Sequence, residues 1–230
     1  METDIAANIE KIKQRIAAAC ARSGRDPHSI ALMAVTKTVP TQRILQAVDA
    51  GITLLGENYV QEAREKHELL GGRAQMHLIG HLQTNKAKYA VRLFDCVHSV
   101  DRLELAQELD RRAKAVNRTM DILIEVNVSG EQTKNGVTTA RAGELIYRIA
   151  TFENLLVRGL MTMAPYSDDP ETSRPYFQAL RNLRDDIVRE RIPRIQMEEL
   201  SMGMTDDFEV AIEEGSTIIR IGRAIFGARQ

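Results

Sequence analysis

The feature that most constrains the fold is a regular alternation of short apolar runs with amphipathic helical segments. The first run covers residues 31–37 and is bounded by turn signals, and a helical pattern begins soon after it at Thr41. Short apolar runs of this kind predict buried strands of a parallel sheet. The expected strands are residues 30–37, 53–58, 75–81, 95–100, 121–128, 156–163, 199–204 and 217–222. A helical segment follows each strand, and one more helix, residues 4–22, precedes the first.

Alternation of strands and helices predicts parallel pairing with right-handed crossovers. Eight strand–helix units in 230 residues favour a closed (β/α)8 TIM barrel, with residues 1–230 forming a single domain. An open doubly wound sheet is the structural alternative. Its dinucleotide-binding form is disfavoured, because no G-x-G-x-x-G motif follows the first strand.

Charge and composition argue against several classes of protein. The formal net charge is −1 and the two signs are interspersed, so no strong attraction to nucleic acid or to an anionic membrane is expected. No apolar run reaches the length of a membrane span, and the N-terminal segment does not resemble a signal peptide. Cys20 and Cys96 belong to no metal-binding or redox motif and indicate reduced thiols. These features predict a cytoplasmic protein.

Polar residues gather where the predicted strands end, which in barrels of this type is where chemistry is done. Lys37 lies at the end of the first strand, where a partly desolvated lysine can act as a Schiff-base nucleophile. The alternative is an ordinary solvated lysine at a strand exit. The other residues at strand ends are Asn58, His81, Ser99, Asn127, Met163, Ser201 to Met204, Arg220 and Gly222.

Arg220 is the most informative of these residues. It shares one face of the eighth predicted strand with Ile218 and Gly222. Both faces of a barrel strand are covered, so its guanidinium should be buried and needs a partner. Two interpretations of that partner stay open: a core carboxylate such as Glu57 or Glu125, or an acceptor atom of a ligand.

Two glycine-containing turns follow the seventh and eighth predicted strands. Residues 201–205 (Ser-Met-Gly-Met-Thr) and residues 222–227 (Gly-Arg-Ala-Ile-Phe-Gly) each lead into a helix. In barrels, phosphate often binds at these two loops, where glycine allows close approach and helix N–H groups are available. The alternative is two ordinary turns, but their pairing on adjacent strands favours a phosphate site.

Two histidines raise the question of a metal. His77 and His81 lie four residues apart on the third predicted strand and would point the same way. No clear third ligand follows them, and histidines of this kind are more often packing residues, so no metal site is predicted. The methionines at positions 161, 163, 202 and 204 indicate core filling or pocket walls.

A Schiff-base lysine, a buried arginine and a phosphate turn would together suit a phosphorylated aldehyde. Pyridoxal 5′-phosphate (PLP) carries an aldehyde, a ring nitrogen and a phosphate, so PLP is the predicted cofactor. A competing interpretation is an aldolase-type barrel whose lysine works without PLP. The lysine of barrel aldolases usually lies on a later strand, which counts against that interpretation.

At these residues the chain strongly resembles the pyridoxal phosphate homeostasis protein family. The matching segments, in the family's order along nearly the whole chain, are residues 34–37 (Ala-Val-Thr-Lys), 56–62 (Gly-Glu-Asn-Tyr-Val-Gln-Glu), 77–86 (His-Leu-Ile-Gly-His-Leu-Gln-Thr-Asn-Lys), 160–163 (Leu-Met-Thr-Met), 200–204 (Leu-Ser-Met-Gly-Met), 219–222 (Ile-Arg-Ile-Gly) and 224–227 (Ala-Ile-Phe-Gly). The resemblance implies a barrel like the N-terminal domain of alanine racemase, with PLP on Lys37 as an internal aldimine.

The resemblance also implies the surroundings of the cofactor. Arg220 would face the pyridine nitrogen. The phosphate would be held by Ser201, Gly203, Gly222 and Arg223. Many members carry a small hydroxyl residue at position 223, and Arg223 can bind phosphate there instead through charge-assisted hydrogen bonds. The positions that match the lining of the ring pocket are Asn58, His81 and Met163.

The family is described as binding and managing PLP, without an established reaction. An arginine keeps its proton near neutral pH, so Arg220 would leave the ring nitrogen unprotonated and the ring a weaker electron sink. Alanine racemase takes a catalytic tyrosine from a partner subunit and relies on a second domain, for which no residues follow here. We therefore expect a PLP carrier without catalytic residues. The alternative is a racemase-like enzyme that uses a residue such as Tyr59, Tyr166 or Tyr176.

The expected partners are PLP itself and the apo forms of PLP-dependent enzymes. No nucleic-acid or membrane partner is expected. An open barrel mouth favours a monomer.

Overall fold

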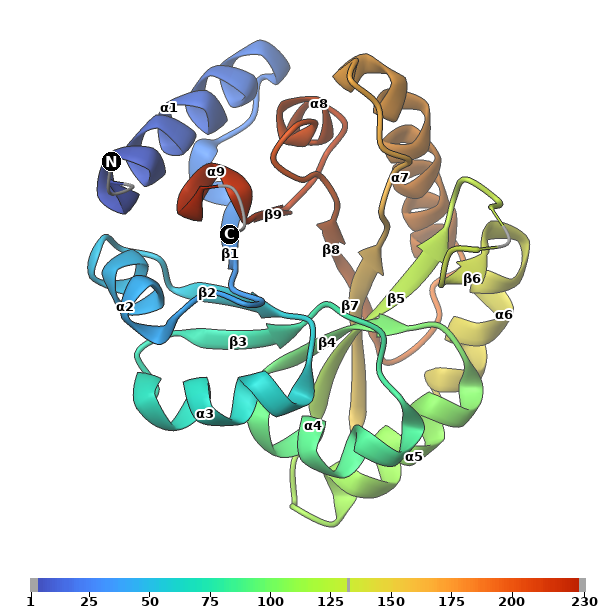
Figure 1. The fold of residues 1–230 in the computed structure, drawn as a ribbon. Helices are drawn as coiled ribbons and strands as arrows, with labels where there is room; N and C mark the ends of the chain where they lie inside the picture. The colour runs from blue at the N-terminus through green and yellow to red at the C-terminus, as the bar shows by residue number, and fades with distance from the viewer. Residues whose placement is uncertain (1–3, 132, 228–230) are drawn as a thin grey trace.

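The computed structural model describes residues 4–131 and 133–227, and helices surround a ring of parallel strands (Figure 1). In this part of the chain, eight strands close into a barrel in the order β4-β3-β2-β1-β9-β8-β7-β5, and β5 pairs back to β4. They are β1 (Ala31–Val35), β2 (Leu54–Glu57), β3 (Gln75–Leu78), β4 (Cys96–Val100), β5 (Met120–Asn127), β7 (Leu155–Met161), β8 (Ile195–Ser201) and β9 (Ile218–Ile221). A two-residue strand, β6 (Val137–Thr138), pairs with the end of β5. The predicted (β/α)8 barrel is confirmed.

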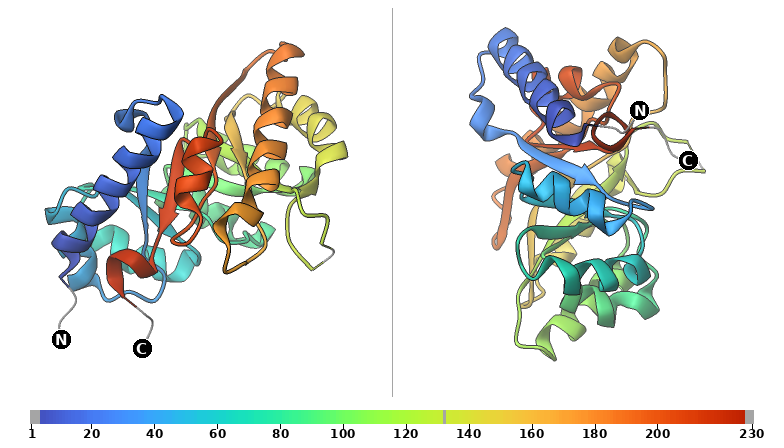
Figure 2. Two further views of the ribbon diagram at one scale, coloured as in Figure 1. Left: turned by 90° about the horizontal axis from the view of Figure 1, so that it is seen from above. Right: turned by 60° about the vertical axis from the view of Figure 1, so that its left-hand side comes forward.

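The helices lie on the outside of the barrel, as the two further views in Figure 2 show. They are α1 (Ile5–Ser23), α2 (Thr41–Asp49), α3 (Val60–Leu70), α4 (Ala87–Leu93), α5 (Leu103–Lys114), α6 (Thr139–Ile149), α7 (Arg174–Arg189), α8 (Phe208–Glu213) and α9 (Arg223–Phe226). Short 3-10 turns cover Pro27–Ser29, Thr84–Lys86 and Pro170–Ser173. Among the residues described, no helix is both long and apolar enough to cross a membrane.

The leading helix, α1, is fixed by its ends and by one apolar stripe. The Asp4 carboxylate accepts a hydrogen bond from the N–H of Ala7, and Gly24 ends the helix with φ of 67°. The buried stripe consists of Ile5, Ile9, Ile12 and Ile16. The helix lies beside α8 and α9, where the Asn8 amide donates to the carbonyl oxygen of Ile225 (3.1 Å). The first helix therefore packs against the end of the described chain.

Successive strand residues face opposite sides of the barrel wall. The residues that face outward join the large core under the helices, as Ala34 and Ile219 do. The residues that face inward form two apolar groups, Met33, Leu54 and Ile218 on one side and Cys96, Leu123 and Met161 on the other. Polar side chains share this interior, and they are His77, His98, Glu125, Ser201 and Arg220. The barrel interior thus contains a buried polar layer.

Two strands, β8 and β3, differ most from the boundaries expected from the sequence. The strand predicted at residues 199–204 begins at Ile195 and ends at Ser201, because the chain turns at Gly203. The strand predicted at residues 75–81 ends at Leu78. The backbone at Gly80 comes so close to residue 58 that a Cβ atom would lie 2.3 Å from the Asn58 carbonyl oxygen. His81 consequently lies in the loop after β3.

Candidate functional site

Lys37 lies in the turn that follows β1. Met33 and Val35 occupy inward-facing positions near the end of this strand, and Lys37 comes at the next alternate position. The lysine is half-buried. All eight barrel strands are parallel, so this turn lies at the same end of the barrel as the other strand-to-helix turns, the end where such barrels place their sites. We call this end the barrel mouth.

The turn after β9 approaches the same end of β1. A Cβ atom at Gly222 would lie 3.4 Å from both the Cβ and the carbonyl oxygen of Val35, so a larger side chain would press on the strand that leads to Lys37. The carbonyl oxygen of Gly222 accepts from the N–H of Ile225 (3.0 Å), which is the first bond of α9. The N–H groups of the residues before Ile225 have no acceptor within the helix. They lie in the turn predicted to hold phosphate.

The turn after β8 admits only glycine at position 203. Gly203 has φ of 93°, and a Cβ atom there would lie 2.5 Å from the Cβ of Ala211. The carbonyl oxygen of Gly203 accepts from the backbone N–H of Arg220 (3.0 Å). The Asp207 carboxylate accepts from the N–H of Met204 (2.6 Å) and closes the turn. The turn after β8 is thus held to β9, two residues before the turn at Gly222.

Arg220 is buried as predicted, but neither expected carboxylate is its hydrogen-bond partner. Its Nη1 donates to the carbonyl oxygen (2.6 Å) and the hydroxyl oxygen (2.7 Å) of Ser201, and its Nη2 donates to the carbonyl oxygen of Thr162 (2.7 Å). Burial lowers the pKa of Arg220 to about 10, so the guanidinium stays charged near neutral pH. The interpretation of a direct pair with Glu57 or Glu125 was wrong, because the guanidinium donates instead to main-chain carbonyls at the ends of β7 and β8 and to the Ser201 hydroxyl.

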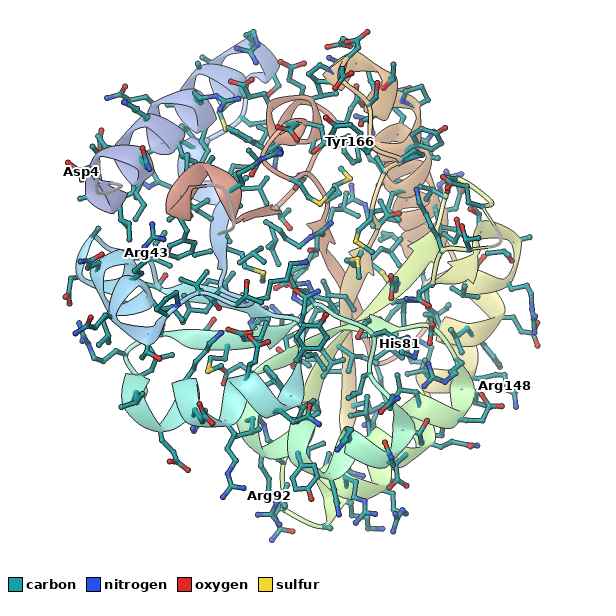
Figure 3. The ribbon with its side chains drawn as sticks, viewed as in Figure 1. Asp4, Arg43, His81, Arg92, Arg148 and Tyr166 are labelled. Atoms are coloured by element: carbon teal, nitrogen blue, oxygen red, sulfur yellow. The ribbon has the colours of Figure 1, made fainter. Side chains whose placement is uncertain are left out.

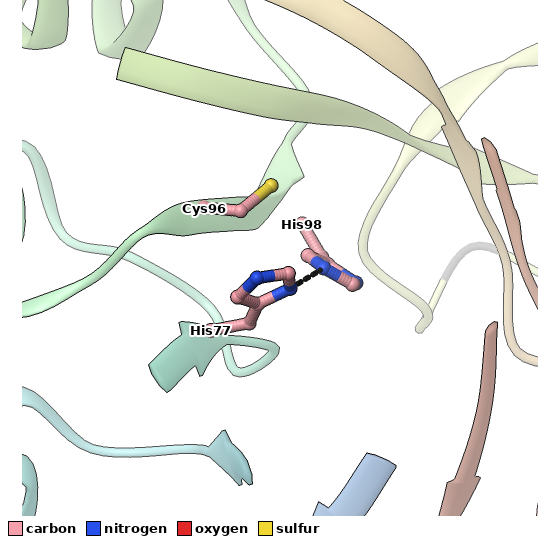
Figure 4. A group of neighbouring side chains, drawn as sticks. All are labelled: His77, Cys96 and His98. Atoms are coloured by element: carbon pink, nitrogen blue, oxygen red, sulfur yellow. Dashed lines mark hydrogen bonds between the residues drawn. The ribbon is translucent and has the colours of Figure 1, made fainter. Parts of the chain in front are cut away.

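A chain of hydrogen bonds extends from Arg220 into the barrel. The Ser201 hydroxyl oxygen lies 3.1 Å from Nδ1 of His98, and Nε2 of His98 lies 2.9 Å from Nδ1 of His77 (Figure 4). Burial lowers the pKa of His77 to about 4 and holds that of His98 well below its usual value. Both rings are therefore neutral near pH 7, beside a charged arginine.

The Sγ atom of Cys96 lies near these rings, and Figure 4 shows the three side chains together. Their potential ligand atoms lie within 4.8 Å of one another. Burial and the carboxylate of Glu199 raise the pKa of Cys96 well above its usual value, so its thiol is protonated near neutral pH. The two rings hydrogen-bond to each other. The earlier idea that His77 and His81 point the same way was wrong, because His81 lies outside β3 and is exposed.

The three residues expected to line a ring pocket lie in turns that follow strands. Asn58 follows β2, and its side-chain oxygen Oδ1 is buried without a hydrogen-bond partner. His81 is exposed in the loop after β3, where Figure 3 labels it. Met163 follows β7 by two residues and is 40% exposed. All three lie at the mouth, and their contact with a ring stays a prediction.

Of the four residues expected to hold phosphate, two are engaged with protein groups. Arg223 is exposed at the start of α9 and forms an ion pair with Asp206. Ser201 is fully buried, and its hydroxyl group contacts Arg220 and His98. A phosphate contact at either residue stays a prediction, as it does at Gly203 and Gly222.

One part of the site was missed from the sequence. Lys66 on α3 is buried, and its Nζ donates to Glu57 Oε1 (2.7 Å) and to the carbonyl oxygen of Thr36 (2.7 Å), directly before Lys37. A signal was present, because Lys66 occurs at helical spacing among the buried residues Ala63 and Leu70. A lysine on the apolar face of a helix indicates a buried partner.

Comparison with known proteins supports this description of the fold. Residues 3–230 match the family described as the N-terminal domain of alanine racemase. Together with the barrel and the lysine after β1, this match places the chain among the barrels of that class.

The relatives define the family more narrowly. A pyridoxal phosphate homeostasis protein of Aquifex aeolicus is 45% identical over 96% of this chain and 97% of its own length. The chain therefore belongs to the pyridoxal phosphate homeostasis protein family.

Two solved structures are similar over nearly the whole chain. A crystal structure of a protein from Bifidobacterium adolescentis has a TM-score of 0.91 and 39% identity, and covers 96% of this chain and 94% of its own. PipY of Synechococcus elongatus, in a structure with PLP bound, has a TM-score of 0.82 and 35% identity, and covers 94% of this chain and 100% of its own.

Proposed function

We propose that this chain binds PLP at the barrel mouth as a Schiff base on Lys37, and that it holds and passes on the cofactor in the cytoplasm as a monomer. The observation that carries the proposal is the PLP-bound structure of PipY, which is 35% identical to this chain and covers 94% of it. The names of the curated relatives support a role in homeostasis.

The residues of the mouth fit the chemistry of PLP. The buried Oδ1 of Asn58 has no hydrogen-bond partner, and a donor on a bound ligand would satisfy it. The turn at Gly222 offers N–H groups to a phosphate. Three hydrogen bonds to protein use three of the five N–H groups of Arg220, and the other two can donate to a ligand.

Attachment requires the neutral amine of Lys37. Its Nζ lone pair adds to the aldehyde carbon, and the aldehyde oxygen leaves as water with the two amine hydrogens. A C=N bond replaces the C=O bond, and no oxidant or reductant is needed. When bound, PLP supplies an electron-withdrawing ring. Arg220 stays protonated. It donates a hydrogen bond but does not transfer its proton, so a ring nitrogen beside it stays unprotonated. This property favours holding the cofactor over catalysis.

The attachment is tested with the purified chain. We expect an absorbance band at about 420 nm, typical of a PLP Schiff base, and after borohydride reduction a mass increase on the peptide that contains Lys37. Lys37→Ala should lose both signals. The matched control is Lys13→Ala on the exposed side of α1, which should keep them. A colourless chain that takes up no PLP when offered it, or reduction at other lysines alone, would overturn the assignment.

The carrier role is tested by mixing the PLP-loaded chain with an apo PLP-dependent enzyme and following the recovery of that enzyme's activity. We expect recovery to be faster than hydrolytic release of PLP from the chain alone. The second candidate is an amino acid racemase, which the match to the alanine racemase N-terminal domain favours. Incubation with single enantiomers of amino acids, followed by chiral chromatography, should give no interconversion. Steady conversion would favour the racemase.

A further inference from the structure

The turn that carries Lys37 has an unfavourable backbone conformation. The N–H of Val39 donates to the carbonyl oxygen of Thr36 (3.0 Å), which closes a four-residue turn around Lys37 and Thr38. Thr38 has φ of 60°, in the left-handed region. That conformation is rare for a β-branched residue, and it persists only where the surroundings enforce it.

Two side chains of α3 and one of β2 enforce it. The Glu62 carboxylate accepts a hydrogen bond from the N–H of Thr38 (2.9 Å). The Lys66 ammonium donates to the carbonyl oxygen of Thr36 (2.7 Å), and the Thr36 hydroxyl donates to Glu57. The residues on both sides of Lys37 are therefore held by charged groups. We call Glu57, Glu62 and Lys66 the turn clamp.

The turn clamp is internally connected. The Lys66 ammonium lies 2.7 Å from Glu57 Oε1 and 3.4 Å from Glu62 Oε2, so its three donors have three acceptors, counting the Thr36 carbonyl. Lys66 is 7% exposed and Glu57 is completely buried. The second carboxylate oxygen of Glu57 has no hydrogen-bond partner. A buried ion pair of this kind is seldom more stabilising than apolar side chains of the same volume. What it provides here is a fixed backbone at residues 36–38.

We propose that Glu57, Glu62 and Lys66 are positioning residues for Lys37. They hold Thr38 in its left-handed conformation, so that the Lys37 amine is presented at one place in the mouth and not spread over several orientations. This inference rests on the proposed function, in which Lys37 forms the Schiff base with PLP. It concerns how fast that bond forms and not how tightly the rest of the ligand binds.

Two variants of the turn test it. Thr38→Gly introduces a residue that adopts positive φ without strain but also many other conformations, so the turn loses its restraint. Lys66→Met keeps about the same side-chain length without the charge. Each variant is mixed with PLP and the absorbance at about 420 nm is followed. The Schiff base should form at least about tenfold more slowly than in the native chain, because a small misplacement of a reacting group slows a reaction strongly. Affinity for pyridoxamine 5′-phosphate, which lacks the aldehyde, should be unchanged.

Matched controls separate positioning from stability. Arg191→Gly matches Thr38→Gly, because it places glycine at a position outside the mouth where φ is 51°. Arg181→Met matches Lys66→Met, because it removes the cation that pairs with the buried Glu214 carboxylate. Both should form the Schiff base at the native rate. Thermal melting of each variant checks that it is folded. If Lys66→Met does not fold, Glu62→Ala replaces it, because Glu62 is partly exposed and contacts the turn through the N–H of Thr38.

The outcomes distinguish the two proposals. Native rates in Thr38→Gly and in the folded clamp variant would overturn the role of the turn clamp. Equal loss of rate and of pyridoxamine 5′-phosphate affinity would also overturn it, because that pattern indicates a damaged pocket. Failure of the native chain to form any Schiff base at Lys37 would instead refute the proposed function.

Discussion

Nδ1 of His98 lies 3.1 Å from the hydroxyl oxygen of Ser201, and the same oxygen accepts a 2.7 Å hydrogen bond from Nη1 of Arg220. Ser201 thereby joins an imidazole on β4 to a guanidinium on β9 through the barrel interior. All three residues are buried, so water does not replace a lost partner. The stability of this polar layer depends on the serine hydroxyl.

Ser201→Ala should lower the free energy of unfolding by about 1–3 kcal/mol, because Nδ1 of His98 and Nη1 of Arg220 each lose a hydrogen-bond partner in a buried place. Urea unfolding of the chain without PLP measures this. Ser29→Ala is the control, since Ser29 is exposed and its hydroxyl donates to the backbone of Asp26, and its effect should stay within about 0.5 kcal/mol. Equal effects of the two substitutions would contradict the assigned role of Ser201.

Glu125 should make the chain less stable as the pH rises through neutrality. Burial, with the nearby Asp101, raises the pKa of Glu125 to about 7 from an ordinary value near 4.5. Between these two pKa values the folded state keeps the proton and the unfolded state has lost it. The contribution of Glu125 to the free energy of unfolding is therefore complete below pH 4.5 and is lost as the pH rises through 7. At about 1.4 kcal/mol per pH unit, the loss amounts to about 3 kcal/mol.

Glu125→Gln should remove this dependence. The difference in unfolding free energy between the variant and the native chain should shift in favour of the variant by up to about 3 kcal/mol between pH 4.5 and pH 8. Glu10→Gln, an exposed residue of α1, should show no such shift. A constant difference for Glu125→Gln across this range would show that Glu125 ionises normally in the folded chain.

His77 should have the opposite effect at lower pH. Burial lowers its pKa from 6.5 to about 4, so the unfolded state gains a proton that the folded state does not bind. Its contribution to stability is complete above pH 6.5 and is lost as the pH falls through 4, by up to about 3 kcal/mol. His77→Gln, which can still hydrogen-bond to His98, should reduce the slope of the unfolding free energy against pH between pH 6.5 and 4, and the slope due to His98 should remain. His28→Gln, at an exposed turn, should leave that slope unchanged.

Two glycines of the barrel should respond oppositely to alanine. A Cβ atom at Gly159 on β7 would lie 1.8 Å from the carbonyl oxygen of Glu199 on β8, which the backbone cannot accommodate without separating the strands. A Cβ atom at Gly143 in α6 meets nothing within 4 Å. We expect Gly159→Ala to destabilise by at least about 3 kcal/mol and Gly143→Ala to stabilise by about 0.5–1 kcal/mol. Thermal melting compares them, and a mild effect at Gly159 would contradict the strand contact.

Several features of the site could be predicted because they depend on periodicity along the chain. The two-residue period of β9 placed Arg220 inside the barrel, and the parallel order of the strands placed Lys37 at the mouth beside the turn at Gly222. The alternation of strands and helices along the sequence was sufficient to predict the barrel itself. The position of His81 was wrong, because the close approach of Gly80 to residue 58 ends β3 early, and such an approach leaves no periodic signal.

The sequence by itself determined that parallel strands would close around an inward arginine and end at a lysine, because side-chain alternation and apolar spacing are local properties. Tertiary structure decided which groups those residues contact. Arg220 donates to the main-chain carbonyl oxygens of Thr162 and Ser201. Because every residue has a carbonyl group, no sequence pattern distinguishes these two. Lys66 hydrogen-bonds to Thr36 because α3 packs across the ends of β1 and β2. That placement of α3 is set by the packing of the whole barrel.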